Sequence, residues 1–212
     1  GEALLDARFR LFERGLSAEA DLASSSRELL ARLRQALRLE QHLALLDELE
    51  EVARTHSSSR ADARSLLPAL ERLFAGLRAE APTLFAAGSA QRSDFFRALA
   101  GARYMAAAES LATAQEIPFE TLLGLWDRSI LAVESPPPAA ALHETMARAL
   151  DRLLCESPVP DRLAASLRAQ LSSALDEKIV PAQTVGTGYG RARLPFPREC
   201  IRSEILCHGL GA

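Results

Sequence analysis

Leucine and alanine recur at helical spacing along most of this sequence. The pattern runs from about Ala3 to about Leu175, is interrupted by serine, glycine and proline, and stops at Pro181. Apolar residues at every third or fourth position are typical of amphipathic α-helices, and runs of β-branched residues, which would favour strands, are scarce. We therefore predict an all-α fold, an irregular helical bundle of about seven helices with an extended C-terminal tail.

Serine, glycine and proline mark the ends of the predicted helices. Their approximate ranges are 2–13, 25–54, 59–88, 93–113, 118–134, 139–154 and 161–175, followed by a short helix at 199–207. Pro136–Pro138 is the strongest interruption, because consecutive prolines adopt a stiff, extended conformation. We place a boundary there. Residues 1–135 form the main helical bundle, residues 139–212 form a helical hairpin with an irregular tail packed on it, and the two parts make one compact unit.

The second predicted helix carries two apolar seams. At about 100° per residue, Leu30, Leu33, Leu37 and Ala44 fall on one face, whereas Leu39, Leu43, Leu46 and Ala53 fall on another. A helix with two apolar faces must contact two sets of neighbours. We expect the chain's own helices to cover the first seam and to leave the second for a partner. The acidic residues that follow would form the polar rim of such an interface: Asp47, Glu48, Glu50 and Glu51.

Apolar stripes on the fourth and fifth predicted helices indicate which of their residues are buried. Trp126 lies in the middle of the apolar stripe of the fifth helix, so we predict that it is a core residue. In the fourth helix, Leu99, Ala102 and Ala106 follow Phe95 at helical spacing. A buried face of small residues would let another helix approach closely.

Proline also bears on the third helix. Pro68 falls inside this segment, where it either starts a fresh helix or kinks a longer one.

Charge and cysteine content indicate an intracellular protein. The 212 residues carry a net charge of −3, so the chain has no general attraction to nucleic acid. Three widely spaced cysteines do not form a secreted disulfide framework, and no apolar run is long enough to be a transmembrane segment. We expect the cytoplasm as the compartment.

Residue usage bears on the source of the sequence. Lys178 is the only lysine and asparagine is absent, which is typical of a GC-rich genome and favours a bacterial or viral source. The sequence starts at Gly1 rather than at methionine, which favours a fragment of a longer protein.

Three motifs match chemical sites only in part. Cys200, Cys207 and His208 lie close in the sequence but lack the short paired spacing of zinc ligands. His143 and Glu144 begin like a zinc-protease helix, but Ala147 stands where the second histidine is required. The glycine-rich segment 186–190 follows a predicted helix rather than a strand and has no phosphate-loop lysine. We therefore expect no catalytic residue, no metal site and no cofactor, and we do not expect an enzyme.

Arginines line up between the two seams of the second helix. Arg27, Arg34 and Arg38 could bind phosphates or an acidic partner. Because Glu28 and Glu40 are close by, we favour a solvated helix face over a binding surface.

Protein–protein interaction is the function that these features favour. We expect a scaffold or adaptor domain of a larger intracellular assembly, whose partner is another protein or a second copy of the chain. The candidate interface residues are Leu39, Leu43 and Leu46 of the second seam, and Tyr189 and Phe196 of the tail. The alternatives are a helical enzyme with a dispersed active site and a ligand-sensing regulatory domain. A scaffold should expose a contiguous apolar patch, whereas the alternatives should enclose a pocket with convergent polar groups.

Overall fold

The all-α prediction is confirmed. The computed structural model describes residues 2–17, 26–58, 60, 62–86, 96–114, 117–133, 139–157 and 159–180. Within these ranges the chain forms seven helices and no strand. The helices are α1 (Glu2–Ser17), α2 (Ser26–Ser58), α3 (Ala63–Leu84), α4 (Phe96–Thr113), α5 (Phe119–Val133), α6 (Ala139–Glu156) and α7 (Asp161–Asp176).

Some sequence predictions concern segments outside the described residues. These are the extended tail, the short helix at 199–207 and the prolines at 136–138, together with Tyr189 and Phe196. The chain divides into two units, Gly1–Asp176 and Glu177–Ala212, and all seven helices belong to the first. The predicted boundary near residue 136 stays a prediction.

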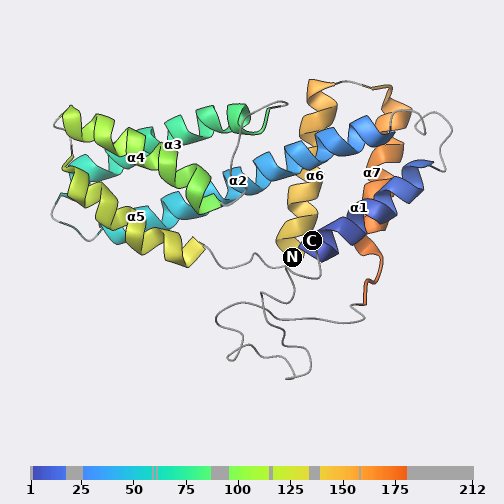
Figure 1. The fold of residues 1–212 in the computed structure, drawn as a ribbon, viewed down its shortest axis with the longest axis horizontal. Coiled ribbons are helices and arrows are strands. Elements are labelled where there is room, and N and C mark those ends of the chain that lie inside the picture. Colours follow the sequence, from blue (N-terminus) through green and yellow to red (C-terminus); the bar gives the residue numbers. More distant parts are fainter. Residues whose placement is uncertain are drawn as a thin grey trace, which may run out of the picture. The chain divides into compact units, whose positions relative to one another are not determined.

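Helix α2 is the central element of the first unit. Its 33 residues contact α1, α3, α4, α5 and α6 (Figure 1). Its C-terminal half packs with α3, α4 and α5 in what we call the α3–α5 core, whose α2 residues are Leu46, Leu49 and Ala53. Its N-terminal half packs with α1, α6 and α7 in the α1–α7 core, whose α2 residues are Leu30, Leu33, Ala36 and Leu37. One helix therefore carries two separate hydrophobic cores.

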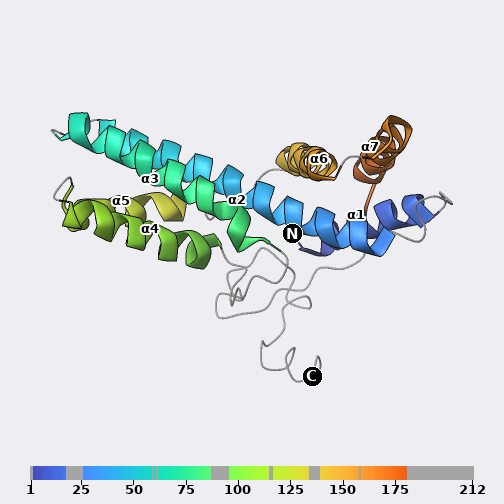
Figure 2. The ribbon, with the colours of Figure 1, turned by 90° about the horizontal axis from the view of Figure 1, so that it is seen from above.

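The two cores lie on opposite faces of α2. Leu37 of the α1–α7 core and Leu46 of the α3–α5 core are nine residues apart, which corresponds to half a turn of rotation about the helix axis. Figure 2 shows the same arrangement, with α6 and α7 above α2 and α4 and α5 below it. The prediction that α2 contacts two sets of neighbours is confirmed.

The expectation that the second seam is left uncovered is wrong. Leu39 and Leu46 are only 6% and 0% exposed, and Leu43 is half-buried against the α3–α5 core. The chain covers both seams because α3 and α5 pack along the C-terminal half of α2. Ala44, assigned to the first seam, is exposed, because that seam ends where the α1–α7 core ends.

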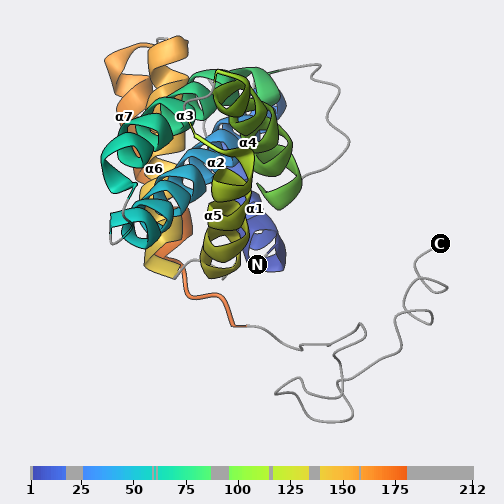
Figure 3. The ribbon, with the colours of Figure 1, turned by 90° about the vertical axis from the view of Figure 1, so that its left-hand side faces the viewer.

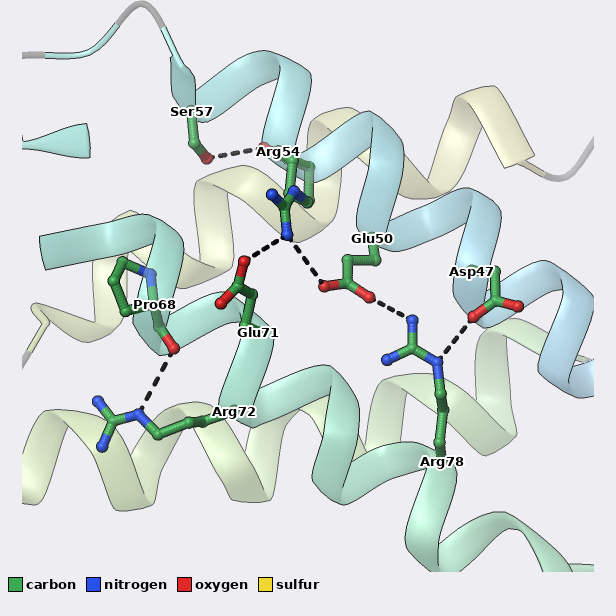
Figure 4. A network of polar contacts seen from close by, with 9 residues as sticks. Asp47, Glu50, Arg54, Ser57, Pro68, Glu71, Arg72 and Arg78 are labelled. Atoms are coloured by element: carbon green, nitrogen blue, oxygen red, sulfur yellow. Dashed lines mark hydrogen bonds and ion pairs between the residues drawn. The ribbon is translucent and has the colours of Figure 1, made fainter. Parts of the chain in front are cut away.

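Arginine–carboxylate contacts tie α2 to α3 beside this core (Figure 4). Arg78 donates to Asp47 at 2.7 Å and also to Glu50. Arg54 donates to Glu71 at 2.7 Å and lies 3.8 Å from Glu50. The hydrogen bond to Glu71 is the main cause that raises the pKa of Arg54 above its usual value. Asp47 and Glu50, expected in the rim of an interface, therefore bind a neighbouring helix of the same chain.

The α3–α5 core is built around aromatic rings. Tyr104 lies between Phe74 and Trp126, with ring centroids 6.1 and 4.9 Å away. Its phenol donates a hydrogen bond to the Leu122 carbonyl at 2.9 Å, and burial raises its pKa. Trp126 is buried, as predicted. In Figure 3 the helices of this core are nearest the viewer.

The predicted buried face of α4 is wrong. Its buried residues are Ala100, Tyr104 and Ala108, whereas Ala102 and Ala106 are exposed and Leu99 is half-buried. Alanine lies all round this helix, so its pattern does not define a face, and the orientation follows the burial of the Tyr104 ring. Close approach still occurs at a small residue, because a Cβ added at Gly101 would lie 3.1 Å from Trp126 Cζ2.

Helices α1 and α2 each extend four residues past their predicted ends. Helix α1 continues through Gly15 to Ser17, and Gly15 faces the side chain of Gln170 in α7, where a Cβ would collide with the amide oxygen. Helix α2 continues to Ser58, where the Ser57 hydroxyl donates back to the Ala53 carbonyl at 2.7 Å. Serine that bonds to its own helix does not terminate it.

Proline does not divide α3. The helix contains both Pro68 and Pro82, and Pro68 is exposed in its second turn. A fresh start at Pro68 is therefore not observed. The apolar stripe of this helix is buried in the α3–α5 core and includes Leu70, Leu73, Phe74 and Leu77.

Candidate functional site

The junction of the two cores on α2 holds two buried polar residues. Glu40 is 7% exposed and lies at the contact of α2 with α6. One carboxylate oxygen accepts a hydrogen bond from Arg152 at 2.6 Å, and the other accepts a longer one from Arg148 at 3.4 Å. Arg148 also donates to the Thr145 hydroxyl at 3.3 Å. A buried carboxylate needs charged or hydrogen-bonding partners, and both partners of Glu40 come from α6, so these contacts fix α6 on α2.

His42 is buried on the other side of the junction. It is 5% exposed, and its ring lies between Phe85, just after α3, and Phe96, which begins α4. The centroid of the His42 ring lies 5.3 Å from that of Phe85 and 5.2 Å from that of Phe96. Burial lowers the pKa of His42 to about 4, because the charged form loses hydration. The imidazole is therefore neutral at pH 7 and acts as an aromatic packing group.

The surface between α6 and α7 has a shallow groove. It encloses about 280 Å3, with an apolar floor of Ala147, Leu150, Leu171 and Leu175. Its polar lining residues are His143, Asp151, Arg168 and Ser172. Arg168 donates to Asp151 at 2.9 Å, and Ser172 donates to Asp176 at 3.3 Å. Arg168 and Asp151 thus bind each other, and Ser172 binds a residue outside the lining, rather than converging on the space between the helices.

The structure does not bring the predicted interface residues together at the surface. Leu39 and Leu46 are buried, Leu43 is half-buried, and Tyr189 and Phe196 lie outside the described residues. The role of all five in binding a partner stays a prediction. The exposed large apolar residues among the described residues are Leu131 and Val180, at 65% and 70% exposure. Within the first unit, Leu131 alone does not make the contiguous apolar patch that a scaffold is expected to expose.

The arginine stripe is partly used inside the chain. The guanidinium of Arg34 lies 4.6 Å from the centre of the Phe9 ring in α1, a cation–π contact. Arg38 is exposed. The side chain of Arg27 lies outside the described residues. Arg34 thus helps to hold α1 against α2.

The described residues add little support for a metal site at the candidate motifs. In the described part of the chain, no three His, Cys, Asp or Glu side chains are grouped so that they could hold a metal ion. Cys155 and His143 are exposed, and Cys200, Cys207 and His208 lie outside that part. None of the helices in the described ranges combines the length and the apolar composition needed to cross a membrane.

Glu40 and His42 are the residues that sequence reasoning missed. Glu40 lies three residues after Leu37 and seven after Leu33, so it continues the first seam. His42 lies four residues before Leu46 and seven before Leu49, so it is in register with the second. A polar residue in register with an apolar seam was the available signal.

Comparison with known proteins yields no relative. The chain matches no protein-family model, and no curated protein or solved structure is significantly similar to it.

Proposed function

We propose that this chain is a protein–protein interaction scaffold or adaptor in a larger intracellular assembly of a bacterium or virus. Its partner is another protein or a second copy of the chain. The observation that carries the proposal is the construction of α2, one helix that holds two separate cores on opposite faces.

The length and fixation of α2 support this role. A helix of 33 residues is about 50 Å long, which exceeds what a single small core needs. Arg152 holds Glu40 on one side of the junction, and Phe85 and Phe96 hold His42 on the other. Two helical groups held at a fixed spacing and angle offer a partner a surface that needs little ordering upon binding, which favours affinity.

The contact surface of such a scaffold would be polar. Exposed side chains on α2 include Glu48 and Glu51 in the C-terminal half. Polar interfaces gain specificity and association rate from charge complementarity, and salt weakens them. We therefore expect the partner to dissociate as salt concentration rises.

The groove between α6 and α7 bears on the alternatives. A ligand sensor or a helical enzyme would need polar groups that converge on an enclosed space. The groove is open, and Arg168 pairs with Asp151 within its lining. This groove therefore does not itself favour either alternative.

The test is to lower the helix stability of α2 at the junction without changing a side chain of either core. Gln41 is half-exposed and Ala44 is exposed, so Gln41→Gly with Ala44→Gly removes little packing. Each glycine should cost about 1 kcal/mol of helix stability. The matched control is Ala102→Gly with Ala106→Gly, two exposed positions in α4.

Partner capture is measured by cross-linking and mass spectrometry in cells of the natural source. The proposal expects the α2 variant to lose a partner that the wild type and the α4 control both retain. Equal capture by the two glycine variants would contradict the role of α2, and the absence of any reproducible cross-link would contradict a scaffold.

A further inference from the structure

We draw no further inference here: the strongest candidate, the groove between α6 and α7 lined by His143, Asp151 and Arg168, carries none, because nothing in the structure shows what covers it.

Discussion

The two cores of this chain are assembled from very different stretches of sequence. The α3–α5 core joins helices that follow one another, from Leu46 to Val133. The α1–α7 core joins α1 to α7, so that Phe9 and Phe12 belong to one cluster with Leu171 and Leu175. Arg8 of α1 even donates to the Ala174 carbonyl at 2.7 Å, across 166 residues of sequence.

Their composition differs as well. The α3–α5 core contains Phe74, Tyr104 and Trp126 in one aromatic row. The α1–α7 core relies on leucine, with Phe9 and Phe12 as its buried aromatic residues. Contacts between sequence neighbours cost less loop-closure entropy than contacts between distant segments. We therefore expect the α3–α5 core to form first and to open last.

Truncating the aromatic residues should have the largest effect. Trp126→Ala removes the centre of the α3–α5 core, and Phe12→Ala removes a fully buried ring from the α1–α7 core. Each should lower the free energy of unfolding by about 3–5 kcal/mol. Urea unfolding measures the loss, and Leu131→Ala, at a position that is 65% exposed on the same helix as Trp126, is the control. Wild-type stability of Trp126→Ala would mean that Trp126 is not a core residue.

Acid should weaken the α3–α5 side of the junction. His42 binds a proton near pH 6.5 when unfolded, but burial lowers its pKa to about 4 in the folded chain. The unfolded state therefore binds more protons as pH falls from 6.5 to 4, and stability decreases over this range. The loss is at most about 3 kcal/mol.

The variant His42→Leu separates this effect from that of other groups. Leucine fills the site between Phe85 and Phe96 without a titratable group. The stability difference between wild type and variant should shift in favour of the variant as pH falls from 6.5 to 4. A difference that is constant with pH would contradict the burial of a neutral imidazole.

Alanine substitutions at Gly101 and Gly15 compare how closely the α3–α5 core and the α1–α7 core are packed. Alanine at either position should gain up to about 1 kcal/mol of helix propensity. At Gly101 the new Cβ would press on the Trp126 ring at 3.1 Å, and this ring is fixed by Tyr104. At Gly15 it would meet the far end of the half-exposed Gln170 side chain, which can swing away.

The two substitutions should therefore have opposite signs. We expect Gly101→Ala to destabilise by about 1 kcal/mol, because overpacking outweighs propensity. Gly15→Ala should be neutral or stabilising. Thermal unfolding of both variants is the measurement, and the opposite order of stabilities would contradict the packing described here.

Ser129 gives the smallest expected effect. Its hydroxyl is buried in α5 and has no hydrogen-bond partner among the described residues. Removing an unsatisfied polar group removes its desolvation cost, so Ser129→Ala should stabilise by about 1 kcal/mol or less. Chemical denaturation should show a higher midpoint, and a lower one would reveal a partner of this hydroxyl.

The sequence predicted most of the fold because leucine spacing defines helices well. Seven helices, the two faces of α2 and the burial of Trp126 all followed from periodicity. Helix ends were less predictable, since Ser57 and Gly15 are compatible with both a helix and its end. In α4, alanine on every side removed the contrast on which the prediction of a buried face depends.

Coverage of the second seam could not be predicted from α2 alone. Whether Leu43 and Leu46 face solvent depends on how α3 and α5 pack, which is a tertiary property. The same limit applies to Asp47 and Glu50. The sequence shows these residues only as part of an acidic run. Their partner, Arg78, belongs to the next helix and is brought to them by the packing of α3 on α2.

Native-state hydrogen exchange followed by mass spectrometry tests the central claim, that α2 joins two separate cores. The measurement compares wild type with Phe12→Ala. The account predicts faster exchange in α1, α6, α7 and the N-terminal half of α2, with unchanged protection in α3, α4, α5 and the C-terminal half of α2. Equal loss of protection in all seven helices would contradict it, because the chain would then open as a single core.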